Sequence, residues 1–268
     1  MKSWNKINEI QKKNNSILCI GLDSGLDKIP KHLGNDLNAL LKFNIAVIEA
    51  TKDLVCAYKM NLAFYEQYGA DGYKILKETF EYIGNEIFTI ADAKRADIGN
   101  TSRAYAKSAF EYFNADSITV NPYMGKDSVM PFLEVPGKMV FLLALTSNEG
   151  SNDFQRMETN GKPLFQNVIE KSKSWSTSEN LGYVIGATHP DELKNIRKII
   201  PEHYLLIPGI GSQGGSIGET ISANSGGPAI INVSRDIIYA SGEMNFSDIV
   251  RQKAEFYRDS FNNSEKIS

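Results

Sequence analysis

Charged side chains interrupt the ends of apolar, strand-like segments at several places in this sequence. Asp92 and Lys94 close the segment that begins at Phe88, and their spacing of two residues puts both side chains on the same side of a strand. Lys59 interrupts a second such segment, and Asp23 ends a third. Charges at neighbouring strand ends are costly to bury unless they pair and serve a function. A lone Asp-x-Lys pair would indicate a structural ion pair, but the additional lysine and aspartate favour an electrostatic active site.

A second group of residues has the character of an anion-binding site. The glycine-rich stretch Pro208-Gly-Ile-Gly-Ser-Gln213-Gly-Gly follows one apolar run, and Ser234 and Arg235 end the next. Backbone N–H groups in such a turn, together with an arginine fork, can bind a phosphate group. The glycines alone would fit a tight turn equally well, but their combination with Arg235 predicts phosphate binding.

The elements that must position these residues alternate between short apolar runs and longer helical patterns. The apolar runs cover residues 16–23, 57–61, 87–94, 117–121, 139–147, 181–188, 204–210 and 229–235. Helical patterns cover residues 36–55, 64–83, 102–113, 164–175, 190–200, 217–223 and 247–261. Near-continuous apolar strands are typical of a parallel sheet that is covered on both faces.

Eight such units in about 250 residues predict an α/β fold, a single-domain (β/α)8 TIM barrel over residues 1–268, with the active site at the carboxyl ends of the strands. The alternative is an open doubly wound sheet, but no Gly-x-Gly-x-x-Gly motif follows the first run. The connections 148–163 and 209–216 are longer than usual. In a barrel, both would lie at the face where active sites form.

Composition excludes several classes of protein. The 268 residues are 42% hydrophobic and 23% charged, and the net charge of -3 does not suit a protein that binds nucleic acid by neutralising phosphates. Cys19 and Cys56 are too few for a disulfide framework. The longest strongly apolar run, residues 139–145, is far shorter than the roughly 18 residues of a membrane span. No apolar segment of a secretory signal opens the chain, so a cytoplasmic protein is expected.

One motif is specific enough to indicate a family. An Asp-x-Lys-x-x-Asp-Ile sequence followed by a threonine is present at Asp92, Lys94, Asp97, Ile98 and Thr101. Further matching positions are Leu22-Asp23, Lys59 with Asn61, Asn121-Pro122, Thr146-Ser147-Asn148, the glycine-rich stretch with Gln213, and Arg235. Together these residues resemble the orotidine 5'-phosphate decarboxylase family along nearly the whole chain. The length and the Thr-Ser-Asn stretch are similar to its longer bacterial and protozoan subgroup.

The resemblance implies that orotidine 5'-monophosphate (OMP) is decarboxylated to UMP and CO2, the last step of de novo pyrimidine biosynthesis. It also implies that no metal or organic cofactor takes part, and His32, His189 and His203 are indeed too scattered to suggest a zinc site. Lys94 would stabilise a carbanion at C6 of the pyrimidine and donate the proton. Asp92 and Asp97 would hold Lys94 charged and aimed, and Lys59 would complete an alternating network.

Substrate contacts follow from the same resemblance. It assigns them to Asp23, Ile98, Thr101, Asn121, Ser147, Pro208, Gln213, Ser234 and Arg235. Asp23 and Lys59 would contact the ribose, Ser147 the pyrimidine edge, and Arg235 the phosphate. Asp97 and Thr101 would reach into the site of a neighbouring subunit, which implies a homodimer with shared sites. The charge and the short apolar runs described above leave neither nucleic acid nor a membrane as an expected partner.

Two other hypotheses about the function remain open at this point. A Mg²⁺-dependent sugar-phosphate decarboxylase or aldolase of the same suprafamily shares the Asp-x-Lys-x-x-Asp core, but it binds metal through carboxylates that include a glutamate on the second strand. Lys59 stands on that strand here and would repel a cation. A non-catalytic phosphate-binding barrel is the other reading, although it would not need alternating charges.

Overall fold

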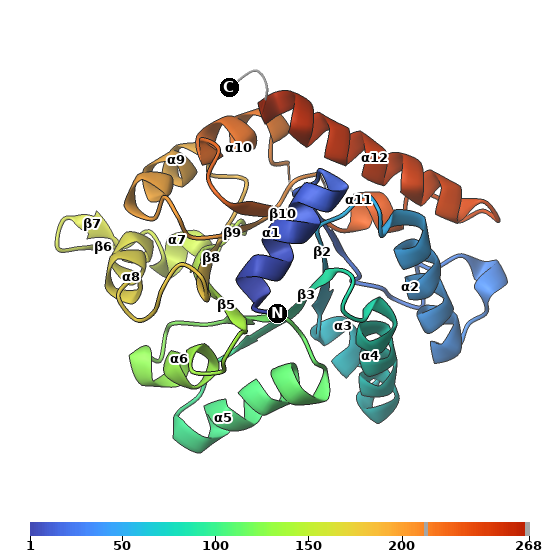
Figure 1. The fold of residues 1–268 in the computed structure, drawn as a ribbon, viewed down its shortest axis with the longest axis horizontal. Helices are drawn as coiled ribbons and strands as arrows, with labels where there is room; N and C mark the ends of the chain where they lie inside the picture. The colour runs from blue at the N-terminus through green and yellow to red at the C-terminus, as the bar shows by residue number, and fades with distance from the viewer. Residues whose placement is uncertain (212–213, 266–268) are drawn as a thin grey trace.

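Eight parallel strands close into a barrel in the computed structural model, which describes residues 1–211 and 214–265 (Figure 1). The strands are β1 (Leu18–Gly21), β2 (Ala57–Asn61), β3 (Phe88–Arg95), β4 (Ser117–Val120), β5 (Met139–Leu145), β8 (Leu181–Ile185), β9 (Leu205–Pro208) and β10 (Ala229–Val233). They follow one another around the ring in chain order, and pairing of β1 with β10 completes it. This closure confirms the predicted barrel and excludes the open doubly wound sheet.

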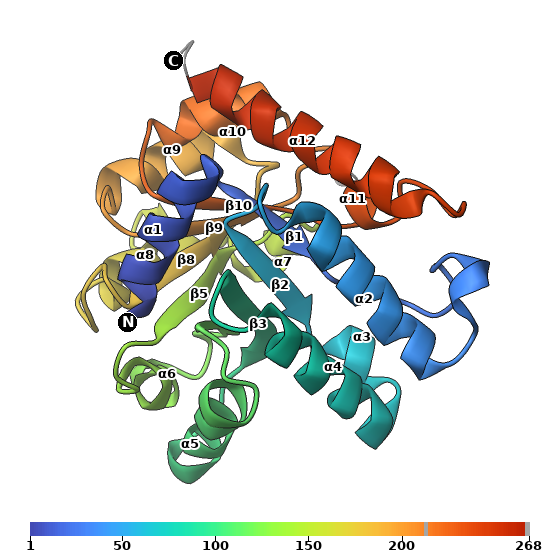
Figure 2. The same ribbon diagram turned by 45° about the vertical axis from the view of Figure 1, so that its right-hand side comes forward.

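Helices cover the outside of the barrel (Figure 2). They are α2 (Leu37–Thr51), α3 (Ala63–Glu66), α4 (Gly69–Ile83), α5 (Gly99–Lys107) with the π-helical η2 (Ser108–Tyr112), α6 (Lys126–Leu133), α8 (Leu164–Ser172), α9 (Pro190–Ile199), α10 (Ile217–Asn224), α11 (Arg235–Ile238) and α12 (Phe246–Glu265). In α2, the buried Leu40, Phe43 and Val47 recur every three or four residues and form the face toward the strands. The Asp36 carboxylate caps the start of α2 by accepting a hydrogen bond from the Ala39 N–H at 2.9 Å.

Side-chain alternation along β2 decides what faces the barrel interior. The Tyr58 hydroxyl donates to the Ile48 carbonyl at 3.1 Å and lies 2.7 Å from the Thr51 hydroxyl, so Tyr58 faces α2. Successive side chains of a strand point to opposite faces. Lys59 is therefore directed to the inside of the barrel.

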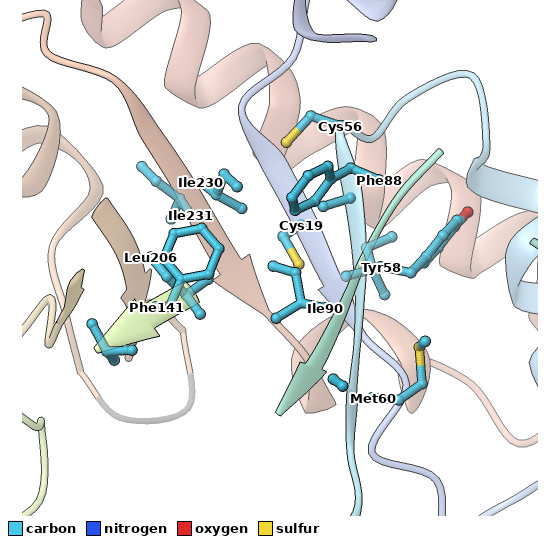
Figure 3. Packing of buried hydrophobic residues seen from close by; sticks show 14 of the residues in the cluster. Cys19, Cys56, Tyr58, Met60, Phe88, Ile90, Phe141, Leu206, Ile230 and Ile231 are labelled. Atoms are coloured by element: carbon cyan, nitrogen blue, oxygen red, sulfur yellow. The ribbon is translucent and has the colours of Figure 1, made fainter. Parts of the chain in front are cut away.

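Apolar side chains fill the barrel below its carboxyl end. Figure 3 shows Cys19, Ile90, Phe141 and Leu206, from β1, β3, β5 and β9, among the residues packed between the strands. None of the four is more than 2% exposed. These apolar side chains form a floor, and the charged groups lie above it at the carboxyl ends of the strands.

The amino end of the barrel is covered by α1 (Ser3–Asn14), which the sequence does not predict (Figure 1). Its apolar pattern is weak, because Trp4, Ile7 and Ile10 are its only large apolar residues. Ile7 and Ile10 are buried in the core, and polar contacts add to this packing. The Lys6 ammonium lies 2.6 Å from the Asp116 carboxylate, and the Gln11 amide donates to the Ala229 carbonyl at 2.7 Å. Because this end is covered, the cavity described below opens at the opposite end.

Other differences from the expected elements have local causes. The pattern over residues 64–83 holds two helices because the chain turns at Gly69, where φ is +62°. The sequence does not predict α6, because Pro131 lies inside this helix and proline is unfavourable in a helix interior. The long connection 148–163 contains α7 (Ser151–Phe154) and an antiparallel pair, β6 (Glu158–Thr159) with β7 (Lys162–Pro163). In the described part of the chain, no helix has both the length and the apolar character that a bilayer crossing requires.

Candidate active site

Four charged side chains form a chain of contacts at the carboxyl ends of β1, β2 and β3. Asp92 is central: its Oδ1 accepts a hydrogen bond from Lys94 Nζ at 2.6 Å, and its Oδ2 accepts one from Lys59 Nζ at 3.0 Å. Lys59 Nζ also lies 3.5 Å from Asp23 Oδ1. The order is therefore Asp23, Lys59, Asp92, Lys94, with alternating sign. Of the predicted network of Lys59, Asp92, Lys94 and Asp97, the structure brings the first three side chains together.

Burial and pairing act in opposite directions on the two central groups. Asp92 is 9% exposed and Lys59 is 4% exposed. Burial favours the neutral form of Asp92, but the ammonium groups of Lys59 and Lys94 outweigh it and hold the pKa of Asp92 well below its usual range. Burial likewise disfavours the charged form of Lys59, yet the carboxylates of Asp23 and Asp92 raise the pKa of Lys59 above its usual value. Both groups therefore stay ionised at neutral pH.

Lys94 adopts a left-handed backbone conformation, with φ of +49°. The pairing of β3 with β4 shifts register between Ala91 and Arg95, and the Lys94 N–H donates to Thr119 Oγ1 at 3.0 Å. The Thr119 hydroxyl in turn donates to Asp92 Oδ1 at 2.9 Å. A left-handed lysine costs about 1–2 kcal/mol, a cost that the surrounding contacts must offset. The Lys94 side chain remains 48% exposed, so a bound molecule can reach it.

Asp23 is held from the other side of the barrel mouth. Its Oδ2 accepts a hydrogen bond from Ser234 Oγ at 2.8 Å, and its Oδ1 accepts one from the Asn61 N–H at 3.3 Å. The Asn232 amide donates to Ser234 Oγ at 3.3 Å. These contacts join β1, β2 and the end of β10 into one polar rim.

The rim surrounds a cavity of about 320 Å³. Its lining includes eight of the residues that the sequence predicts: Asp23, Lys59, Asp92, Lys94, Ser147, Pro208, Ser234 and Arg235. The other lining residues are Asn61, Thr119, Leu143, Thr146, Asn148, Val184, Leu206, Gly209, Ile210 and Asn232. The predicted residue Gln213 lies outside the described residues.

Four other predicted residues, Asp97, Ile98, Thr101 and Asn121, do not line this cavity. Asp97 precedes α5, and its Oδ1 accepts a hydrogen bond from the Ile98 N–H at 2.7 Å. Thr101 is an exposed residue of α5, and Ile98 is 59% exposed. Asn121 follows β4, where its Oδ1 accepts from the Tyr123 N–H at 2.9 Å. Within one chain, these residues are separate from the network around Asp92.

Thr119 is the main polar contact that the sequence analysis did not single out. A threonine in the run 117–121 has the character of an ordinary strand former. The available signal was alternation: Ser117, Thr119 and Asn121 are polar, whereas Ile118 and Val120 between them are apolar. This period of two places the three polar residues on one face of the strand.

The described residues supply fixed charges at this site. Among them, no three His, Cys, Asp or Glu side chains are grouped so that they could hold a metal ion. Two ammonium groups and two carboxylates above an apolar floor can stabilise a charge that develops on a bound molecule. The partly exposed Lys94 can also deliver a proton.

Comparison with known proteins identifies similar chains along the full length. A model of the orotidine 5'-phosphate decarboxylase / HUMPS family matches residues 16–245. Orotidine 5'-phosphate decarboxylase of Christiangramia forsetii is 56% identical over 250 residues, covering 91% of both chains. Its counterpart in Dehalococcoides mccartyi is 45% identical over 273 residues, covering 99% of both. The solved structure of Leishmania donovani OMP decarboxylase matches with a TM-score of 0.88 and 35% identity, covering 100% of both chains.

Proposed function

This chain belongs to the orotidine 5'-phosphate decarboxylase / HUMPS family, and on that basis we propose that it decarboxylates OMP to UMP and CO2, the last step of de novo pyrimidine biosynthesis. The observation that carries this proposal is the alternating chain of Asp23, Lys59, Asp92 and Lys94 at the barrel mouth. The direct test is to follow the ultraviolet absorbance of OMP after the purified protein is added. An unchanged spectrum would contradict the proposal.

The chemistry explains why fixed charges are needed. The bond between C6 of the pyrimidine and the carboxylate carbon breaks, CO2 leaves, and the electron pair remains on C6. No adjacent carbonyl conjugates that charge well, so the site must stabilise it electrostatically. The Lys94 ammonium would lie beside C6, stabilise the developing carbanion and then transfer a proton to it.

Asp92 and Lys59 would position Lys94 rather than exchange protons themselves. The low pKa of Asp92 keeps it a carboxylate, so it holds the Lys94 ammonium by the 2.6 Å hydrogen bond. The raised pKa of Lys59 keeps it charged on the other side of Asp92. Thr119 would add a third donor that orients the same carboxylate.

The remaining lining residues would bind the parts of OMP that do not react. Asp23 and Lys59 would contact the ribose hydroxyls, Ser147 the pyrimidine edge, and Pro208 the ring face. Arg235, with Gln213, would bind the phosphate, while Ser234 orients Asp23. Binding energy from a distant phosphate can lower the barrier at the reacting carbon.

We also infer a homodimer in which Asp97 and Thr101 reach the cavity of the partner subunit. The support is that both residues lie outside the cavity lining of their own chain. Apolar side chains are exposed next to Asp97 and after β4, since Ile98 is 59% exposed and Tyr123 is 89% exposed. Ile98 and Asn121 would take part in the same contact. We further propose that the protein is cytoplasmic and that the chain forms a single domain.

The alternative is a Mg²⁺-dependent sugar-phosphate enzyme of the same suprafamily, but this site favours OMP. Lys59 occupies the second strand where the metal-dependent members would need a carboxylate, and its raised pKa keeps it cationic. The similar chains from Christiangramia and Dehalococcoides are named as orotidine 5'-phosphate decarboxylases. We therefore propose a reaction without a metal or organic cofactor.

Activity on OMP is expected to be unchanged in excess EDTA, because the proposed mechanism uses only side-chain charges. The rate of absorbance change is compared before and after chelation, and again after Mg²⁺ is added. The control is a known Mg²⁺-dependent enzyme in the same buffer. A loss of activity that Mg²⁺ restores would favour the sugar-phosphate alternative.

Arg235→Ala is expected to lower kcat/KM for OMP by about 10- to 100-fold, because it removes a charge-assisted contact to phosphate. The same change should scarcely affect the much slower reaction of orotidine, which has no phosphate. Both rates are measured for the variant and for Arg258→Ala, which removes an arginine of α12 that does not line the cavity. Equal losses on the two substrates would show that Arg235 has a structural role.

A further inference from the structure

Thr146, at the edge of the cavity, has each of its polar groups held by another residue. Its N–H donates to Gln155 Oε1 at 2.8 Å, and Gln155 Nε2 donates to Thr146 Oγ1 at 2.8 Å. The same hydroxyl donates to Asn148 Oδ1 at 2.6 Å, and His189 Nε2 lies 3.2 Å from the Thr146 carbonyl oxygen. Gln155 belongs to the long connection after β5, and His189 immediately precedes α9. Two separate segments therefore fix one lining residue.

The chemistry of the partners fixes the direction of these hydrogen bonds. Arg156 Nη2 lies 3.0 Å from His189 Nδ1, and a guanidinium group can only donate. His189 Nδ1 must then accept, so the ring proton is on Nε2, where the Thr146 carbonyl accepts it. Arg156 also donates to the Glu192 carboxylate of α9. The connection after β5 is thereby tied to the connection after β8.

Ser147, the next residue, is packed tightly from the same side. A Cβ atom added to Gly186 would lie 2.8 Å from both the backbone nitrogen and the Cα of Ser147, which is closer than real contacts allow. The Thr188 hydroxyl lies 3.4 Å from the Ser147 carbonyl oxygen. The turn 146–148 is therefore enclosed between residues 155–156 and residues 186–189.

We propose that Gln155 and His189 are positioning residues for the pyrimidine end of the site, and that they act by fixing Thr146 and thereby Ser147. Neither residue lines the cavity, so both act through Thr146. This inference rests on the proposed function, which assigns the pyrimidine edge to Ser147. A turn that is already fixed loses little conformational freedom when the base binds, and that preorganisation favours binding.

The test separates the base from the rest of the ligand. Gln155→Met keeps the length of the side chain but removes both hydrogen bonds to Thr146. Its affinity for UMP should fall by about tenfold or more, as expected for two lost neutral hydrogen bonds. Its affinity for ribose 5-phosphate, which has the sugar and phosphate but no base, should be unchanged. Both affinities are measured as competitive inhibition of OMP decarboxylation and, for UMP, by calorimetry.

Two further variants keep the test sharp. His189→Leu, which removes the contact to Thr146 from the other segment, should give the same ligand pattern with a smaller loss. Lys162→Met breaks only the contact of β7 with Glu170, at 2.7 Å, and should bind both ligands normally. Equal weakening of UMP and ribose 5-phosphate, or no weakening of either, would overturn the inference. If the unaltered protein neither binds UMP nor converts OMP, the proposed function itself fails and this inference fails with it.

Discussion

Lys94→Ala is expected to lower kcat for OMP by more than about 10⁴-fold, beyond the range of general acid–base groups alone, while UMP still binds. The reason is that Lys94 has two functions in the proposed mechanism. It supplies the positive charge beside the C6 carbanion, and it is the proton donor. Its removal also leaves the Asp92 carboxylate without one of its two ammonium partners. The measurement is single-turnover decarboxylation together with UMP affinity.

Lys94→Gly is the matched control for this prediction. Both changes remove the ammonium group, so both should abolish activity to the same extent. Only glycine accepts the φ of +49° without strain, so Lys94→Gly should have the higher free energy of unfolding, by about 1 kcal/mol. Denaturant unfolding of the two variants measures this difference. A Lys94→Ala enzyme within tenfold of the unaltered protein would rule out the mechanism.

A mixture of Lys94→Ala and Asp97→Ala subunits is expected to be active although each variant alone is nearly inactive. In a mixed dimer with shared sites, one site carries both changes and the other carries neither. Random reassociation of equal amounts yields half mixed dimers, each with one intact site, so activity should recover to about one quarter of normal by twofold symmetry. The two variants are unfolded together, refolded, and assayed for decarboxylation per subunit.

The control for this experiment is a mixture of Lys94→Ala with Lys59→Ala. Both lysines line the cavity of their own chain, so each site of a mixed dimer would lack one of them. That mixture should stay inactive after the same treatment. If the Asp97 mixture also stays inactive despite demonstrated subunit exchange, Asp97 acts within its own chain.

The central contacts of the site could be predicted because strand geometry is simple. A period of two along β2 and β3 puts Lys59 and Asp92 inside the barrel, and β2 and β3 are adjacent. The same reasoning did not reveal the left-handed Lys94 or its contact to Thr119. Both depend on a register shift between β3 and β4, which is a tertiary effect that no local pattern encodes.

In the fold, too, local sequence patterns predict some elements, whereas others depend on tertiary contacts. The barrel followed from repeated apolar runs, whereas α1 was missed because few of its residues are apolar. Its buried Ile7 and Ile10 are supplemented by tertiary polar contacts such as Lys6 with Asp116. Gln155 and His189 gave no signal in the sequence, since each is an ordinary polar residue of a connection. Their relation to Thr146 exists only because the segments after β5 and β8 meet at the barrel mouth.

The unequal exposure of the four charges determines where protons enter the proposed cycle. Conversion of a carboxylate to CO2 and a C–H bond consumes one proton in each turnover. The side chains of Lys59, Asp92 and Asp23 are 6%, 11% and 14% exposed, whereas that of Lys94 is 48% exposed. If Lys94 gives its proton to C6 as proposed, water would be able to restore it directly. In this proposed cycle Asp92 and Lys59 would keep their charges throughout, and the exchange of protons with solvent would take place at the Lys94 nitrogen that also protonates C6.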